Sequence, residues 1–197
     1  MTEPLRTTFT LDYLEWKPWV TRSTDTDLAP ELLERATEAV AGRGGSDYIA
    51  VLTNDFPAWK TRDVVHHHTF AGDDDAQVGW RELGTVSTSR INGCVFCAAV
   101  HARIYAQKSG NRDAIDRFLA DGLAAELPPI ERAIVDLGAT ITNDPESLTS
   151  ADLQPLRDLG LDDDQILDIA NYTAFFANAN RLMLTLGEPV FERPYRG

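Results

Sequence analysis

Hydrophobic residues recur at intervals of three and four over most of this chain, which is the spacing of a helix that buries one face. The spacing predicts helices from Pro30 to Val40, over 47–53 and 57–70, and from Asn92 to Lys108. No stretch shows the sustained period-two alternation that is typical of a half-buried strand. The pattern therefore predicts an all-α, multi-helical protein.

Residues that commonly begin helices mark boundaries in the second half of the chain. In order, they are Asn111, Pro128-Pro129, the capping-box pair Thr149 and Asp152, and the pair Asp162 and Gln165. The last pair opens a long final helix over 162–187. The segment 76–91, just before the cysteines, is assigned no element.

The length of 197 residues fits one domain with one sizeable core. Hydrophobic residues make up 43% and charged residues 25%, which are globular values. Aromatic residues stand among polar ones without a clear period in the first 28 residues. We expect residues 1–28 to form an arm that packs on the core or on a neighbouring subunit, within a single domain over 1–197.

The charge and the cysteine count exclude several classes of protein. A formal net charge of -13 disfavours binding to nucleic acid and to anionic membranes, because clustered Lys and Arg drive both. The first residues carry no cationic and apolar signal, and no apolar run is long enough to span a bilayer, so we expect a cytoplasmic protein. The two cysteines are three positions apart, which predicts redox or metal chemistry rather than a secreted disulfide framework.

The candidate site is Cys94-Val95-Phe96-Cys97, with His101 one helical turn later. On a continuous helix these three side chains fall within about 60° of one another, so they share one stripe. Unpaired backbone N–H groups at the start of a helix favour a thiolate there. A second thiol within reach can convert a sulfenic acid into a disulfide, and an imidazole can move the proton. These residues predict a thiol-redox centre with His101 as acid and base.

Two other interpretations of the same residues stay open. The cysteines could be two small buried apolar residues without chemistry. They could also bind zinc together with His101 and one histidine of the run 66–68, although the spacing is not that of a zinc knuckle. The histidine run by itself is typical of a partly exposed helix face, because adjacent helix positions point in different directions.

The string from Ser89 to His101 resembles the core motif of the alkylhydroperoxidase D-like proteins, within the carboxymuconolactone decarboxylase-like superfamily. It is most similar to the branch of peroxidase-related enzymes, which carries Asn-Gly-Cys-x-x-Cys-x-x-x-His. Glu82 stands twelve positions before Cys94, where the family has its proton-relay glutamate. The resemblance covers about residues 47–140, and the segment around Asn178 and Asn180 also fits this branch.

The resemblance implies an all-helical fold with the cysteine motif at the N-terminal end of a core helix. It implies a peroxidase centre of Cys94, Cys97, His101 and Glu82, without a metal or an organic cofactor, in a homo-oligomer. Cys97, being closer in sequence to His101, is expected to attack the peroxide. Phe96 is a departure, because the best-known members have a histidine there, and it predicts a simpler proton relay with weaker activity.

The leading hypothesis is thus an antioxidant, peroxiredoxin-like peroxidase that reduces hydroperoxides and is recharged by a dithiol electron donor. A redox-sensing or metal-binding module using Cys94, Cys97 and His101 is one alternative. A carboxymuconolactone-type decarboxylase is another, against which the cysteine pair argues. The sequence does not identify the substrate.

Overall fold

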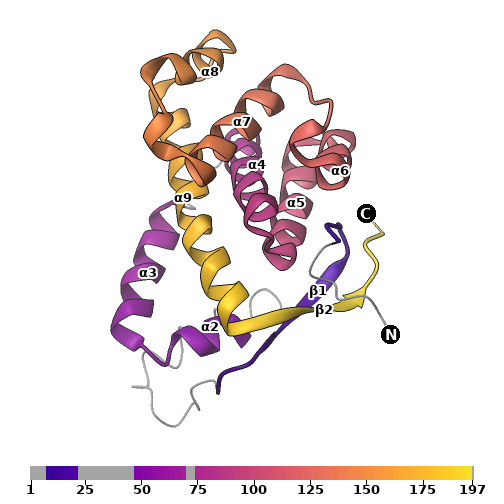
Figure 1. Ribbon diagram of the computed structural model, residues 1–197, viewed down its shortest axis with the longest axis vertical. Coiled ribbons are helices and arrows are strands. Elements are labelled where there is room, and N and C mark those ends of the chain that lie inside the picture. The colour runs from indigo at the N-terminus through magenta and orange to yellow at the C-terminus, as the bar shows by residue number, and fades with distance from the viewer. Residues whose placement is uncertain (1–7, 22–46, 70–73, 197) are drawn as a thin grey trace.

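A computed structural model describes residues 8–21, 47–69 and 74–196 of the chain. In these residues the fold is mostly helical, with one two-stranded sheet (Figure 1). The α-helices are α2 (Asp47–Leu52), α3 (Phe56–Thr69), α4 (Asp75–Asn92), α5 (Val95–Ser109), α6 (Arg112–Asp121), α7 (Pro129–Asn143), α8 (Gln154–Asp158) and α9 (Asp163–Leu186). The all-α prediction is confirmed. The helix predicted from Pro30 to Val40 and much of the predicted arm lie outside the described residues.

The predicted helix starts agree with the structure in the second half of the chain. The Asn111 side chain accepts a hydrogen bond from the backbone N–H of Ala114 at the start of α6. Asp162 and Gln165 form the reciprocal capping box of α9. The box of Thr149 and Asp152 opens a short 3₁₀ turn, Ser150–Leu153, that leads into α8. These starts depend on side chains within one helical turn, so the local sequence specifies them.

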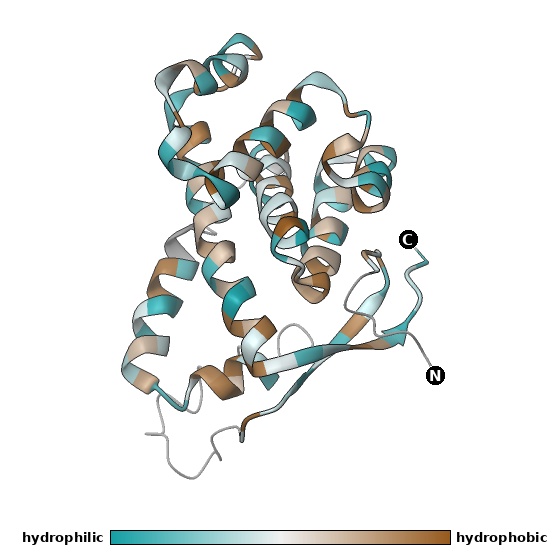
Figure 2. Cartoon of the chain, in the orientation of Figure 1, coloured by the Kyte–Doolittle hydropathy of each residue, from teal (hydrophilic) through white to brown (hydrophobic). Residues whose placement is uncertain are grey.

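Helix α4 is the centre of the fold, and it packs against α5, α7 and α9 (Figure 1). Its buried side chains are largely small and polar, so the helix is pale rather than brown in Figure 2. They include Thr85, Ser87, Thr88 and Ser89, all with 0% exposure. Small residues allow three helices to approach α4 closely. They also explain why hydrophobic spacing assigned no element to residues 76–91.

The two strands were not predicted. Strand β1 (Tyr13–Pro18) pairs antiparallel with β2 (Gly187–Arg193), so the two ends of the described chain form one ribbon (Figure 1). Leu14 and Trp16 of β1 are buried. The ribbon lies near the N-terminal end of α5, and β1 contacts both α2 and α5. The β1 segment of the predicted arm therefore packs on the core, beside the cysteines.

Within the described residues, no helix combines the length and the hydropathy that crossing a bilayer would require.

Candidate active site

The tight turn between α4 and α5 places the first cysteine. Gly93 has φ of 81°, a left-handed conformation that favours glycine. The N–H of Gly93 donates to the carbonyl of Arg90, and the N–H of Cys94 donates to that of Ser89 at 2.8 Å. Both bonds cap the end of α4. Chain direction then changes, and Cys94 becomes the N-cap of α5.

This turn corrects the predicted helix from Asn92 to Lys108. Asn92 is the last residue of α4, and α5 begins only at Val95. Cys94 is therefore not on one continuous helical stripe with Cys97 and His101. Only Cys97 and His101, four residues apart in α5, share a helix face. The prediction was wrong because it continued the helical spacing through Gly93.

The two thiols are nevertheless in contact. The Sγ atoms of Cys94 and Cys97 are 2.7 Å apart, and both cysteines are free and buried. The Sγ atom of Cys97 also lies 3.3 Å from the Sδ atom of Met183 in α9. The second thiol is thus within reach of any group formed on the first.

The protein separates the pKa values of the two thiols. The hydrogen bond from the Cys97 thiol lowers the pKa of Cys94, against the effect of burial, and the Cys97 backbone N–H and the Asn180 side chain lower it further. Burial, followed by the same bond and the charge of Cys94, raises the pKa of Cys97 well above its ordinary value. This difference favours a thiolate at Cys94 and a thiol at Cys97.

Asn180 of α9 is held by two α4 side chains. Asn92 Nδ2 donates to Asn180 Oδ1 at 3.2 Å, and Asn180 Nδ2 donates to Ser89 Oγ at 3.1 Å. Asn180 has 0% exposure. These bonds fix which end of the amide faces the thiols. A buried amide whose N–H groups face a thiolate stabilises the negative charge.

Glu82 and His101 form a second buried pair. The carboxylate Oε2 of Glu82 in α4 lies 2.5 Å from Nδ1 of His101 in α5. The two residues are 2% and 7% exposed, so the pair is shielded from solvent. The Phe176 ring packs edge-on against the imidazole, with 4.1 Å between centroids. The structure thus brings the predicted glutamate and histidine together, next to the helix turn that carries Cys97.

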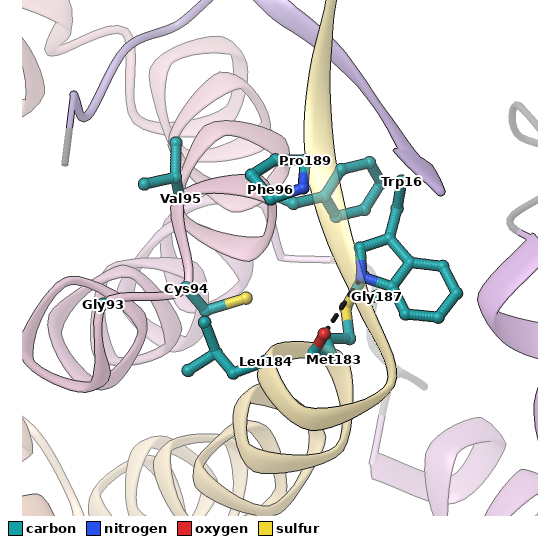
Figure 3. Close-up of a pocket in the computed structure, with 9 residues that line it drawn as sticks. All are labelled: Trp16, Gly93, Cys94, Val95, Phe96, Met183, Leu184, Gly187 and Pro189. Atoms are coloured by element: carbon teal, nitrogen blue, oxygen red, sulfur yellow. Dashed lines mark hydrogen bonds between the residues drawn. The ribbon is translucent and has the colours of Figure 1, made fainter. Parts of the chain in front are cut away.

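A small pocket borders Cys94 (Figure 3). Its volume is about 10 Å³, space for about one water molecule. Figure 3 shows the Cys94 sulfur directed into this space, between α9 and the ribbon. The lining residues are Trp16, Gly93, Cys94, Val95, Phe96, Met183, Leu184, Gly187 and Pro189. Trp16 Nε1 donates to the Met183 carbonyl at 3.1 Å, which fixes the indole at this border.

Among the described residues, no three His, Cys, Asp or Glu side chains gather closely enough to hold a metal ion. The His66 ring packs against Phe175, with 5.7 Å between centroids. The side chains of His67 and His68 lie outside the described part of the chain.

Solved structures of two other proteins share this architecture. One is an alkylhydroperoxidase AhpD core, an uncharacterized peroxidase-related protein from Ralstonia eutropha JMP134. It matches with a TM-score of 0.75 and 25% identity, over 90% of this chain and 92% of its own. The other, an uncharacterized peroxidase-related protein from Silicibacter sp. TM1040, matches with a TM-score of 0.71 and 24% identity, over 88% and 94%. The chain has the alkylhydroperoxidase D-like fold. The resemblance inferred from the cysteine motif is confirmed at this level.

The alkylhydroperoxidase D-like fold also occurs in a debrominase, Bmp8. That structure matches with a TM-score of 0.63 and 17% identity, over 86% of this chain and 90% of its own. No family model and no curated protein matches the chain. Since peroxidase-related proteins and a debrominase share the fold, the reaction has to be argued from the site.

Two residues of the candidate site were not predicted as such. The sequence places Asn180 only in the segment that resembles the peroxidase-related branch, and Trp16 only within the predicted arm. Asn180 did carry a signal, because it is an amide on an otherwise apolar face between Ala177 and Leu184. Such a position indicates a buried hydrogen-bonding role. Nothing local to Trp16 indicates that it reaches the cysteines.

Proposed function

We propose that this protein is a thiol-dependent peroxidase that reduces hydroperoxides through a dithiol–disulfide cycle of Cys94 and Cys97. The observation that carries the proposal is the 2.7 Å approach of two thiols whose pKa values shift in opposite directions. A lowered pKa supplies the nucleophile near neutral pH, and the neighbouring thiol supplies the partner for the disulfide. The two peroxidase-related structural relatives support this class of reaction.

The cycle has two covalent steps. In the first, the Cys94 thiolate attacks one peroxide oxygen; an S–O bond forms and the O–O bond breaks, and the other oxygen leaves and is protonated to the alcohol. In the second, Cys97 attacks the Cys94 sulfenic acid; an S–S bond forms and water leaves. The two thiols are oxidised by two electrons, and the peroxide is reduced by two. An external dithiol donor then reduces the disulfide.

His101 and Glu82 carry the proton in this proposal. Glu82 holds Nδ1 of the ring, which leaves Nε2 as the nitrogen that exchanges protons. His101 accepts the Cys94 proton and later returns it to the departing hydroxide. Glu82 stabilises the imidazolium between these events, because its carboxylate is buried beside the ring.

We further propose, by analogy with the family, that the protein works in the cytoplasm as a homo-oligomer and needs neither metal nor organic cofactor. The negative net charge favours neither nucleic acid nor membrane as a partner. Sedimentation analysis of the purified protein tests the assembly, and a single-chain mass of 21.8 kDa would contradict it.

The two cysteine variants test the chemistry. We expect Cys94→Ser to abolish peroxide consumption with a dithiol reductant. Cys97→Ser should still consume about one equivalent of peroxide, because Cys94 reaches the sulfenic acid, which a dimedone adduct detected by mass spectrometry would show. Turnover should then stop for lack of the second thiol.

The result also decides between the two cysteines. If Cys97 carries the dimedone adduct in the Cys94→Ser protein, Cys97 is the attacking thiol, as its closer position to His101 in the sequence predicted. If both variants consume peroxide as fast as the unmodified protein, the peroxidase proposal is wrong.

A further inference from the structure

Tyr48 is a buried tyrosine that the proposed cycle does not use. It lies in α2, far from the motif in sequence, but packs in one apolar cluster with Trp16, Cys94, Cys97 and Met183. Its ring meets the Trp16 indole edge-on, with 5.6 Å between centroids. Only 5% of Tyr48 is exposed. The phenol therefore belongs to the immediate surroundings of the dithiol.

Within the described residues the Tyr48 hydroxyl has no well-formed hydrogen-bond partner, and the Arg62 guanidinium lies beside it. A buried hydroxyl without such a partner is costly, because it has given up its hydrogen bonds to water without replacement. The group would be satisfied by an oxygen atom brought into the site. Beside a thiolate that attacks peroxides, such an oxygen is one of the substrate's own.

Arg62 of α3 brings a positive charge to the same place. Its guanidinium carbon lies 5.6 Å from the centre of the Tyr48 ring and 4.7 Å from that of Phe175. Its Nε atom is buried and has no hydrogen-bond partner in the part of the chain that the structure describes. No ion pair between Arg62 and a carboxylate occurs within the described residues. A half-buried cation without a carboxylate partner among the described residues favours negative charge on a nearby atom.

We propose that Tyr48 is a further catalytic residue, whose hydroxyl donates a proton to the leaving oxygen of the hydroperoxide, with Arg62 as the positioning residue that stabilises negative charge there. This inference rests on the proposed peroxidase function and deepens it. It also assigns a role to α2 and α3, which the cysteine motif does not include.

The electrostatics of Tyr48 suit a donor. Burial raises the pKa of Tyr48 to about 12, and the nearby Arg62 guanidinium offsets part of that rise, while the charges of Cys97 and Cys94 add to it. The phenol is therefore protonated at neutral pH. An alkoxide is a far stronger base than this phenolate, so transfer of the proton to the departing oxygen is downhill.

The protons balance over the whole cycle. Cys94 gives its proton to His101 and attacks; the O–O bond breaks, and Tyr48 protonates the alkoxide to the alcohol. The Tyr48 phenolate then takes the proton of Cys97. The Cys97 thiolate attacks the sulfenic acid, and hydroxide leaves with the proton held by His101. The sum is one hydroperoxide and two thiols converted to one alcohol, one water and one disulfide.

Oxidants with different leaving groups test this role in the full-length protein. tert-Butyl hydroperoxide expels a basic alkoxide, whereas peracetic acid expels a carboxylate that needs no proton. We expect Tyr48→Phe to slow oxidation by tert-butyl hydroperoxide by about tenfold to a hundredfold, and oxidation by peracetic acid by less than about threefold. Arg62→Met should show the same selectivity, and Arg62→Lys should restore part of the rate. Stopped-flow measurement of the single-turnover rate gives these values.

Two controls separate a catalytic from a structural effect. Tyr195→Phe removes a phenol hydroxyl outside the cluster around the thiols and should leave both rates unchanged. Alkylation of Cys94 by iodoacetamide involves no leaving oxygen, so its rate in Tyr48→Phe should stay within about twofold of the original.

Three other results would contradict the role of Tyr48, and one of them would also contradict the peroxidase proposal. Equal losses with both oxidants, or no loss with either, would overturn the role of Tyr48 while leaving the peroxidase proposal standing. Failure of the unmodified protein to react through Cys94 or Cys97 with either oxidant would overturn both proposals.

Discussion

The charge of the Cys94 thiolate depends on hydrogen-bond donors from two separate helices. Cys97 contributes its thiol and its backbone N–H from α5, and Asn180 contributes its side chain from α9. Hydrogen bonds with Ser89 and Asn92 of α4 fix the orientation of the Asn180 side-chain amide. Because a hydrogen bond to a charged group contributes about 1.5–3 kcal/mol, the loss of one such donor should raise the pKa of the thiol measurably.

We predict that Asn180→Ala raises the pH at which Cys94 is half ionised, because the thiolate loses one of its hydrogen-bond donors. The pKa of Cys94 rises because a thiolate that has lost a hydrogen-bond donor is less stable and forms only at higher pH. Iodoacetamide alkylation rates measured against pH give the midpoint. Asn178→Ala, on an exposed position of the same helix, is the matched control and should leave it unchanged. Coinciding profiles for all three proteins would contradict a role for Asn180.

Among the elements, α4 shows how close packing sets the position of the site. A Cβ atom at Gly84 would lie 2.8 Å from Thr173 Oγ1 of α9, and one at Gly138 would lie 2.9 Å from Ser87 of α4. Both distances are shorter than those that Cβ atoms show in real proteins. The backbones of α4 and α9, and of α4 and α7, can therefore approach this closely only where one of them has a glycine. This close approach holds α9, with Asn180 and Met183, against the cysteines.

The two glycines of α4 give opposite predictions. Gly84→Ala should lower the free energy of unfolding by about 1–3 kcal/mol, because α9 has to move away. Gly79→Ala should raise it by about 0.5–1 kcal/mol, since helix propensity improves and the new Cβ meets Ser109 at an ordinary 3.4 Å. Urea denaturation, monitored by circular dichroism, measures the free energy of unfolding of both variants and of the original protein. Equal effects of the two substitutions would contradict the packing argument.

At the scale of the whole molecule, the ribbon of β1 and β2 joins the two ends of the described chain and closes the pocket over Cys94. Gly187 begins β2 where a side chain would collide with the Trp16 ring and the Lys17 carbonyl. Its φ of -174° is ordinary extended backbone, so the requirement for glycine is one of space. The ribbon can therefore cover the site only if residue 187 has no side chain.

Gly187→Ala should displace Trp16 and loosen the ribbon. We expect the melting temperature to fall by about 3–10 °C, as a cost of about 1–3 kcal/mol implies at this size. Cys94 should also react faster with iodoacetamide at a fixed pH. Glu188→Ala, on the neighbouring exposed position, controls for changes in the strand itself. An unchanged melting temperature and reaction rate would show that Trp16 does not close the site.

The strands illustrate what the sequence could not show. Buried Leu14 and Trp16 alternate with exposed Glu15 and Lys17, but the alternation covers only six residues. Its partner is β2, more than 160 residues away. So short a pattern gains its stability from the pairing, which no local window contains.

The sequence by itself determined the helical class, the capped starts of α6 and α9, and the motif of Cys94, Cys97 and His101, with Glu82 added by resemblance. These features depend on neighbours within one or two turns, or on a spacing that is visible in the chain. Tertiary structure decided the rest. It made Cys94 an N-cap beyond Gly93, and it brought Asn180 and Tyr48 to the thiols. Such contacts join segments that are distant in sequence. They therefore form only when α5, α7 and α9 pack against α4 in the folded protein.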